Sequence, residues 1–500
     1  PNTSTRQETR QETRQGGRGG RAAYRIWEDD HMPSLGDVEP PIALGALDGR
    51  YRAAVAPLVD HLSEAALNRE RVRVEIEWLI HLTSYAVVPG TRALTGTEHE
   101  ALRAIVTNFG AAEIAALADI ERVTVHDVKA VEYFLKERLA ALAPDPADAG
   151  LGELIHFACT SEDINNLAYA LMVKGAVVQV WLPRATALVD QLATMAREHA
   201  ATPLLAHTHG QPATPTTLGK ELAVMVFRLR RQLERIGRTA YLGKLNGATG
   251  TYGAHLAAVP DHDWQATSRG FVESLGLQWN PLTTQIESHD WQAELYADVA
   301  RFNRILHGLA QDMWTYISMG YFAQVRGQGT VGSSTMPHKV NPIRFENAEA
   351  NLEVSTALLD VLAATLVESR MQRDLTDSSM QRNIGTAFGH STLAIDNVAR
   401  GLAGLDAVPE RMAADLDANW EVLAEPIQSA MRALTARGVP GMDNPYERLK
   451  ELTRGRRIGA SELREFVAGL GLPADVEARL QALTPATYVG IAPELVDHLG

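Results

Sequence analysis

The chain has 500 residues, of which 45% are apolar, and its formal net charge is −14. This length suffices for two to four domains with a large core. The acidic balance disfavours general nucleic-acid binding. The sequence contains no run of about 18 apolar residues, so no membrane span is expected. The single cysteine, Cys159, excludes a framework of internal disulfides.

The first 36 residues are of low complexity. The sequence Arg-Gln-Glu-Thr at 6–9 recurs at 10–13, and a Gly/Arg run follows. Such a segment has too little apolar surface to build a core, so a disordered tail is predicted. It lacks the apolar stretch of a secretory signal, and its acidic residues disfavour a transit peptide. Together with the single cysteine, this favours a cytoplasmic protein.

Apolar spacing predicts long helices from residue 59 onward. Between Trp291 and Tyr316 apolar residues recur every three or four positions, which places them on one helix face. A second long helix is predicted over 162–199, with Pro183 as the point of a kink. At 1.5 Å per residue such helices span roughly 50 Å, and helices of that length usually pack in bundles, often across subunits. Further helices are predicted at 213–239, 342–370 and 378–404.

The predicted fold class is therefore all-α, because alternating runs typical of strands are scarce. A Pro/Asp/Gly-rich segment at 144–150 marks a boundary, and the very long helices are expected to end near residue 404. The predicted organisation is a tail at 1–36, an N-terminal helical domain at 37–152, a central long-helix bundle at 153–404 and a C-terminal helical domain at 405–500.

Three polar clusters in the first half are candidates for binding. Arg50 and Tyr51 follow an Asp-Gly turn, and an arginine fork suits phosphate or carboxylate, although surface ion pairs are its commoner fate. His126 falls in the first turn of a predicted helix, where free N–H groups attract anions, but a solvated helix start is the simpler interpretation. Thr160 and Ser161 precede the second long helix. One hydroxyl suffices to cap this helix, so the other is available to bind a carboxylate of a ligand.

Two histidines, His207 and His209, stand two residues apart on a glycine-bearing segment before another helix. A metal pair is disfavoured because no third ligand follows at a recognisable spacing. An acid/base histidine is the stronger functional interpretation, and a structural histidine is about equally open.

The richest segment is Gly332–Pro342, which holds three hydroxyls, a histidine, a lysine, an asparagine and two prolines. It leads into a predicted helix, and free N–H groups at a helix N-terminus favour anion binding. Further on, 373–382 places two arginines and two serines close together. Both segments suit an anionic ligand, although the second could equally form surface salt bridges.

Taken together, these motifs resemble the adenylosuccinate lyase branch of the fumarase/aspartase superfamily, from about Ile42 to Leu495. The segment 332–342 by itself identifies only the superfamily. The resemblance rests on four segments that occur in the family's order, at 126–133, 160–166, 208–215 and 332–342, and on the Arg-Asp-Leu-Thr-Asp-Ser run at 373–378.

The resemblance implies a fumarase/aspartase-like fold, in which a long central bundle is flanked by two smaller helical domains. It implies anti β-elimination of fumarate from succinyl-nucleotides in purine biosynthesis, by a homotetramer whose sites are shared between subunits. No cofactor, metal, nucleic acid or membrane is implied. The implied catalytic residues are Ser333 as base, His209 as acid, Glu346 orienting that imidazole, and Lys339. The implied substrate-binding residues are Arg50, Tyr51, His126, Asp127, Thr160, Ser161, Gln285, Ser334, Asn341, Asn347, Arg373, Ser378 and Arg382.

Two departures and two alternatives accompany this assignment. Val125 stands where many members carry a polar residue, so one substrate contact is expected to be missing or made by the backbone. His207 occupies an often basic position and is a competitor for the acid role.

The alternatives are a sister lyase, such as argininosuccinate lyase, and an inactive structural relative. The arginines near Ser378 disfavour the first, and the intact set around Ser333 disfavours the second.

Overall fold

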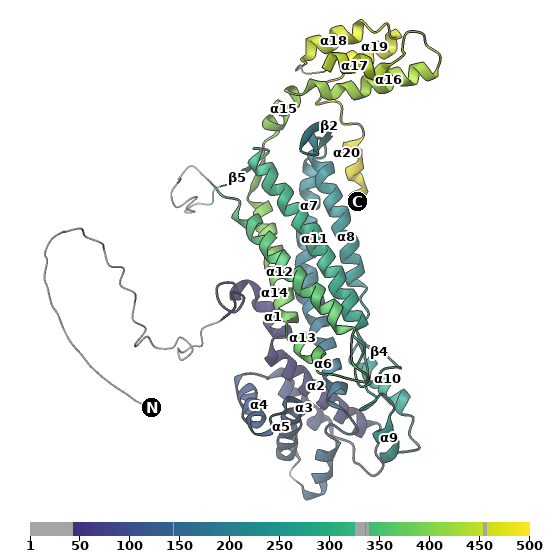
Figure 1. Cartoon of the computed structure of the whole chain (residues 1–500). Coiled ribbons are helices and arrows are strands. Elements are labelled where there is room, and N and C mark those ends of the chain that lie inside the picture. Colours follow the sequence, from purple (N-terminus) through teal and green to yellow (C-terminus); the bar gives the residue numbers. More distant parts are fainter. Residues whose placement is uncertain (1–43, 144, 326–335, 337–339, 454–457) are drawn as a thin grey trace, which may run out of the picture.

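The computed structural model describes residues 44–143, 145–325, 336, 340–453 and 458–500. Over these residues the chain is almost entirely helical, and its strands form three small two-stranded sheets. A long helix bundle carries the first helices at one end and a separate group, from α16 (Ala424–Ala436) to α19 (Ala474–Gln481), at the other (Figure 1). The predicted all-α class and the long central bundle are confirmed.

The N-terminal helices pack around the lower end of the bundle in Figure 1. Ser63 caps α2 by accepting a hydrogen bond from Ala66 N, and a capping box of Thr95 and Glu98 begins α3. The buried face of α2 includes Trp78, which is fully covered. These helices are α1 (Arg52–Leu62), α2 (Glu64–Ser84), α3 (Gly96–Thr107), α4 (Ala111–Thr124), α5 (Asp127–Leu142) and the 3-10 helix η2 (Pro146–Leu154).

The bundle contains one uninterrupted helical run from Ser161 to Glu198, formed by α6, η3 and α7. The kink predicted at Pro183 stays a prediction. A π-helical segment, η3, ends at Trp181, two residues before Pro183, whose missing N–H removes one donor from the regular α ladder. The main bundle elements are α6 (Ser161–Gly175), η3 (Ala176–Trp181), α7 (Leu182–Glu198), α8 (Leu218–Gly237), α11 (Asp290–Ser318), α12 (Ile343–Leu366) and α14 (Ile384–Ala403).

A buried hydrogen-bond chain ties these helices together. Trp181 Nε1 donates to Ser391 Oγ at 2.8 Å, and Ser391 donates to Asn303 Oδ1 at 2.8 Å. Asn303 Nδ2 in turn donates to Ser355 Oγ at 3.0 Å. One side chain comes from each of η3, α14, α11 and α12. These hydrogen bonds therefore fix the register of four helices inside an apolar core.

The helix predicted over 162–199 is confirmed at both ends, but the other predicted bounds need correction. The helix predicted at 342–370 ends at Leu366, and the one predicted at 378–404 is divided into α13, which ends at Gln381, and α14, which begins at Ile384. The start of the helix predicted at 213–239 is wrong. Residues 211–217 form a strand, and α8 begins only at Leu218. Pro212 and Pro215 cannot donate helical hydrogen bonds, and the threonines between and after them favour extended backbone. The strands are β1 (Pro203–Thr208) with β2 (Gln211–Thr217), β3 (Leu242–Gly243) with β4 (Gln278–Trp279), and β5 (Phe322–Gln324) with β6 (Leu405–Ala407).

Within the described ranges, the buried apolar residues form two hydrophobic cores. The larger runs from Leu58 to Met412 and also takes in Val496 and Leu499, while the smaller extends from Trp420 to Leu480. The domain boundaries stay predictions, because the larger core passes from the N-terminal helices into the bundle without a break. The remaining elements are α9 (Gly253–Ala258), α10 (Trp264–Ser274), α13 (Thr376–Gln381), α15 (Pro409–Asp417), η4 (Trp420–Leu423), α16 (Ala424–Ala436), α17 (Pro445–Thr453), α18 (Ala460–Ala468), α19 (Ala474–Gln481), α20 (Ala492–Leu495) and η5 (Val496–Leu499).

Among the described residues, no single helix is long and apolar enough to cross a membrane. One pair bent by 88°, Gly96–Thr107 with Ala111–Thr124, passes that test jointly, on length and composition alone.

Candidate active site

The first group of candidate residues gathers where α6 begins. Thr160 precedes the helix and Ser161 opens it, and the backbone N–H of Thr160 donates to Asp163 Oδ2 at 2.9 Å. The preceding turn holds His156 and Ala158 in left-handed backbone, with φ values of 60° and 58°. Left-handed backbone is uncommon for residues other than glycine, so surrounding contacts must hold this turn.

Helix α2 supplies those contacts. The buried carboxylate of Glu75 accepts from His156 N at 2.9 Å and lies 2.6 Å from His156 Nδ1. Trp78 Nε1 donates to Phe157 O at 3.1 Å. Burial disfavours the charged imidazole, but the hydrogen bond and charge of Glu75 outweigh it and raise the pKa of His156. The turn that leads to Thr160 is therefore fixed from outside the helix that it begins.

The start of α5 lies beside this group. The His126 side chain caps α5, because its Nδ1 accepts from Lys129 N at 3.2 Å. The Asp127 carboxylate accepts from Arg71 Nη2 at 2.7 Å and from Arg382 Nη2 at 3.5 Å. Burial opposes ionisation of Asp127, yet the two guanidinium groups and the Val128 N–H outweigh it and hold the pKa of that carboxyl below its usual value.

A second set of contacts extends the group toward α13. Arg373 Nη1 lies 2.8 Å from the buried Glu162 Oε1 and donates to Gln285 Oε1 at 3.4 Å. Arg373 Nη2 lies 3.8 Å from Asp377, whose neighbour is Ser378. We call the whole group the α6-end cluster. It consists of His126, Asp127, Thr160, Ser161, Gln285, Arg373, Ser378 and Arg382.

Three further residues of this region were missed by the sequence prediction. Arg71 joins Asp127 to Asn165, Glu162 holds Arg373, and Asp163 caps α6. Two adjacent carboxylates in the first turn of a helix were the available signal for Glu162 and Asp163. Arg71 gave none, because its partner Asp127 lies 56 positions away in the sequence.

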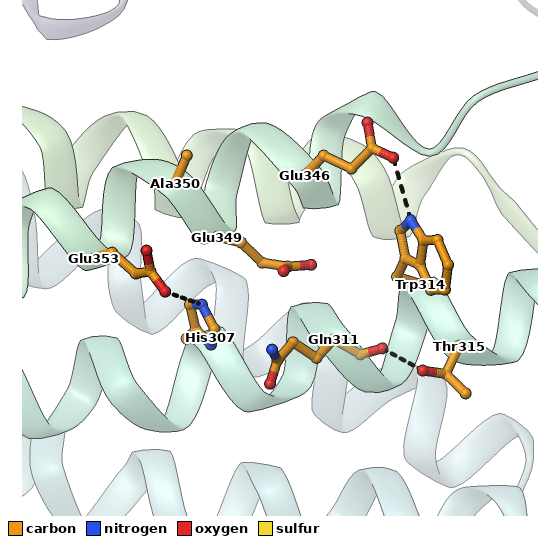
Figure 2. Close-up of a pocket in the computed structure, with 8 residues that line it drawn as sticks. All are labelled: His307, Gln311, Trp314, Thr315, Glu346, Glu349, Ala350 and Glu353. Carbon is orange, nitrogen blue, oxygen red and sulfur yellow. Dashed lines mark hydrogen bonds and ion pairs between the residues drawn. The ribbon is translucent and has the colours of Figure 1, made fainter.

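The second group of candidates lies on α12. Asn347 Nδ2 donates to the hydroxyl of Tyr51 at 3.1 Å. The guanidinium carbon of Arg50 lies 5.9 Å from the centre of the Tyr51 ring. Glu346 Oε1 accepts from Trp314 Nε1 at 3.2 Å and faces a cleft of about 470 Å³ between α11 and α12 (Figure 2).

That cleft is acidic. Figure 2 shows Glu346, Glu349 and Glu353 along α12, opposite His307 and Gln311 of α11. Burial, with the neighbouring carboxylates, raises the pKa of Glu349 even though His307 opposes the shift. This row of glutamates on α12 forms an acidic wall of the cleft, which suits an imidazolium or another cationic group.

Arg50 and Arg382 come from different elements, but their segments approach each other. A cleft of about 330 Å³ is lined by Leu47 and Asp48, which precede Arg50, and by Glu64 and Arg382. In this structure Arg382 is paired with Glu64. A phosphate bound here would therefore compete with Glu64 for the Arg382 guanidinium.

His207 and His209 lie on the β1–β2 hairpin. Thr208 pairs with Gln211, so His209 and Gly210 form the two-residue turn, with φ values of 53° and 72°. Both histidines are exposed. Over the described residues, no hydrogen bond or ion pair joins His209 to Glu346.

The hairpin and the α6-end cluster lie at opposite ends of the bundle (Figure 1). The helical run from Ser161 to Glu198 separates them by about 55 Å at 1.5 Å per residue. The fold of one chain therefore does not bring His209 to Thr160 or Ser161. Ser333, Ser334 and Lys339 lie outside the described residues, whereas Asn341 is described and half-buried just before α12.

Metal ligation gains no support from the described part of the chain, where no group of three His, Cys, Asp or Glu side chains is placed to hold an ion.

Comparison with known proteins identifies relatives along nearly the whole chain. Residues 49–354 match the model of a family described as lyase, and residues 369–489 match the model described as adenylosuccinate lyase C-terminal. The adenylosuccinate lyase of Escherichia coli is 48% identical over 457 residues, which cover 91% of this chain and 98% of that protein. That of Vibrio cholerae is 48% identical over 458 residues, with the same coverage.

Solved structures agree on the fold. A fumarate lyase from a Mesorhizobium species has a TM-score of 0.70 at 20% identity, covering 88% of this chain and 96% of that one. A β-carboxy-cis,cis-muconate cycloisomerase from Acinetobacter calcoaceticus has a TM-score of 0.67 at 15% identity, covering 89% and 99%. At these identities the likeness concerns the fold alone.

Proposed function

Because the chain belongs to the adenylosuccinate lyase family, we propose that it releases fumarate from adenylosuccinate to give AMP, and from the succinyl-carboxamide intermediate SAICAR to give AICAR, in purine nucleotide biosynthesis. The observation that carries this proposal is the match of residues 369–489 to the adenylosuccinate lyase C-terminal model. That segment contains Ser378 and Arg382, which suit a nucleotide phosphate, and Arg373 lies nearby.

The reaction is a β-elimination. Ser333, whose hydroxyl must first be activated by Lys339, takes the proton from the carbon next to a carboxylate, and the electron pair moves into that carboxylate. Lys339 and Asn341 hold the carboxylate while its negative charge grows. The C–N bond then breaks, a C=C bond forms in fumarate, and His209 protonates the departing nitrogen. No oxidant or reductant takes part, because the electrons of the C–H bond end in the new double bond.

The α6-end cluster is assigned to the substrate. Ser161 and Thr160 offer hydroxyls and helix N-terminal amides to a succinyl carboxylate. Arg382, together with Ser378 and the pair Arg50 and Tyr51, is assigned to the phosphate. Glu346 is assigned to orient the His209 imidazole, and the acidic wall of its cleft suits that role.

These assignments require more than one chain. His209 and Ser161 are separated by the length of the bundle within a chain, so a site that uses both needs a second copy. We propose a homotetramer in which three chains contribute to each site. Five large apolar side chains that stay exposed on the long helices of a single chain support assembly there, because a second chain would cover them. They are Val224 and Phe227 on α8, Trp314 on α11, and Val354 and Val361 on α12.

The proposed location is the cytoplasm, and the proposed partners are small succinyl-nucleotides rather than nucleic acid or membranes. The single Cys159 supports a reducing compartment. The net charge of −14 supports neither duplex nor anionic-lipid binding.

An absorbance assay of adenylosuccinate cleavage, with fumarate release measured independently, tests the proposal. Argininosuccinate serves as the control substrate for a sister lyase. Turnover of adenylosuccinate alone supports the proposal. Turnover of argininosuccinate alone would favour the sister lyase, and turnover of neither would favour an inactive relative.

A further inference from the structure

The carboxylate of Asp163 is the best-connected acid near the candidate site. It lies in the first turn of α6 and its side chain is 0% exposed. It accepts from Thr160 N at 2.9 Å on its own helix, and from Asn246 N at 2.9 Å and Gly247 N at 3.1 Å on a distant loop. One buried side chain thus joins two segments that are about 80 positions apart in the sequence.

Lys244 completes this arrangement from the loop. Its Nζ lies 2.9 Å from Asp163 Oδ1, donates to Gly247 O at 3.3 Å, and is also 0% exposed. The two charges therefore neutralise each other out of contact with water. A buried ion pair adds little net stability over a well-packed apolar pair, so stability alone does not account for this pair.

The loop 244–250 carries this constraint toward the substrate residues. Gln285 Nε2 donates to Ala248 O at 2.9 Å, and Asn246 Nδ2 donates to Thr283 Oγ1 at 2.8 Å. Gly250 has a φ of +73°, and a Cβ there would lie 2.2 Å from Thr283 O, so the two loops touch backbone to backbone. The position of Gln285 therefore follows the position of the loop.

The contacts close into a ring. Gln285 Oε1 accepts from Arg373 at 3.4 Å, and Arg373 lies 2.8 Å from Glu162, the neighbour of Asp163 on α6. The ring therefore links the helix that carries Ser161 to Gln285 by two routes, one through the loop 244–250 and one through Arg373.

We propose that Asp163 and Lys244 are positioning residues that hold the N-terminus of α6 and the loop 244–250 in the one arrangement in which Ser161 and Gln285 meet the same substrate. This inference rests on the proposed function, which assigns both residues to the succinyl-nucleotide. Neither Asp163 nor Lys244 touches the substrate, since both are enclosed.

Paired variants separate positioning from stability. Asp163→Asn leaves Lys244 unpaired in the interior, whereas Asp163→Asn with Lys244→Met removes both charges and should recover much of the lost Tm. The double variant should still have kcat/KM for adenylosuccinate lowered by at least about tenfold, with an unchanged pH profile, because geometry and not acid–base chemistry is altered.

Asn166 provides the matched control. It ties the same helix to the same loop, since Lys244 N donates to its Oδ1 at 2.8 Å and its Nδ2 donates to Lys244 O at 3.0 Å. It lies one turn further from Ser161. Asn166→Ala should lower the Tm yet keep kcat/KM within about threefold of wild type. A double variant that loses less than tenfold, or an Asn166→Ala variant that loses as much, would contradict the proposal.

Amide exchange in the wild-type protein gives a test that does not depend on folding of a variant. The Asn246 and Gly247 amides should exchange slowly without ligand, and succinyl-nucleotide should slow them little further, because the loop is already fixed. Fast exchange in the free protein would overturn the inference. A wild type that shows slow exchange but cleaves no adenylosuccinate would instead refute the proposed function.

Discussion

His209 and Ser161 lie at opposite ends of the same helical bundle, with the uninterrupted run of α6, η3 and α7 between them (Figure 1). One residue stands on a hairpin turn and the other opens a helix. A reaction that needs both must therefore join the two ends of the bundle from different copies of the chain.

The two hairpin histidines should differ in function. Protonation of the leaving nitrogen requires one imidazole, so His209→Ala should lower kcat by about 10²-fold or more, whereas His207→Ala should keep most of it. Steady-state kinetics of both variants decide between them. An inactive His207 variant beside an active His209 variant would reverse the assignment.

Arg382 should recognise the phosphate. Arg382→Ala should weaken succinyl-nucleotide binding by about 1.5–3 kcal/mol, the scale of one charge-assisted contact. The same substitution should weaken binding of a dephosphorylated succinyl-nucleoside far less. The comparison is a double-mutant cycle in which one of the two changes is made in the ligand.

Arg370 is the control for this cycle, because its side chain is 84% exposed and pairs with Asp374 outside the α6-end cluster. Arg370→Ala should leave both ligands unaffected. Equal penalties from Arg382→Ala for both ligands would show that Arg382 does not contact the phosphate.

Val125 should be a site of strain. This β-branched residue has a φ of 50° and ends α4, and its side chain is largely exposed, so little packing compensates for the left-handed backbone. Val125→Asn or Val125→Gly should raise the free energy of unfolding by about 1 kcal/mol. Thermal unfolding measures the change. Val123→Asn, at an exposed position inside the same helix, should not raise the Tm, and an equal gain there would argue against strain relief.

The pair of His156 and Glu75 should give stability that depends on pH. The raised pKa of His156 means that the ion pair stabilises the fold fully below the unfolded pKa of about 6.5, and that this contribution is lost as the pH rises through the folded pKa. The Tm difference between wild type and His156→Asn should thus be larger at pH 6 than at pH 9. Asparagine tolerates the left-handed backbone at this position.

Glu75→Gln should abolish the extra stability at low pH, because the imidazolium then has no hydrogen-bonded carboxylate partner and burial opposes its charge. A Tm difference that stays constant from pH 6 to pH 9 would show that the two side chains form no ion pair.

Helix periodicity predicted the long helices because it depends on neighbours three and four positions apart, and α11 fits the pattern between Trp291 and Tyr316. The β1–β2 hairpin escaped prediction because the extended start of 211–217 depends on pairing with 203–208. Residues within short motifs, such as Thr160, could be proposed as site residues from their immediate sequence neighbours alone. The pairing of Lys244 with Asp163 could not, because only the folded chain brings those charges together.

The most direct test of a site shared between chains is complementation between two inactive variants. Ser333→Ala and His209→Ala proteins would be prepared separately, dissociated, mixed and reassociated, and adenylosuccinate cleavage would be measured against each variant treated alone. If each site draws on different chains, some mixed sites receive an intact serine and an intact histidine, so activity should return to a sizeable fraction of wild type. Absence of activity, with mixed oligomers shown to be present, would contradict the account.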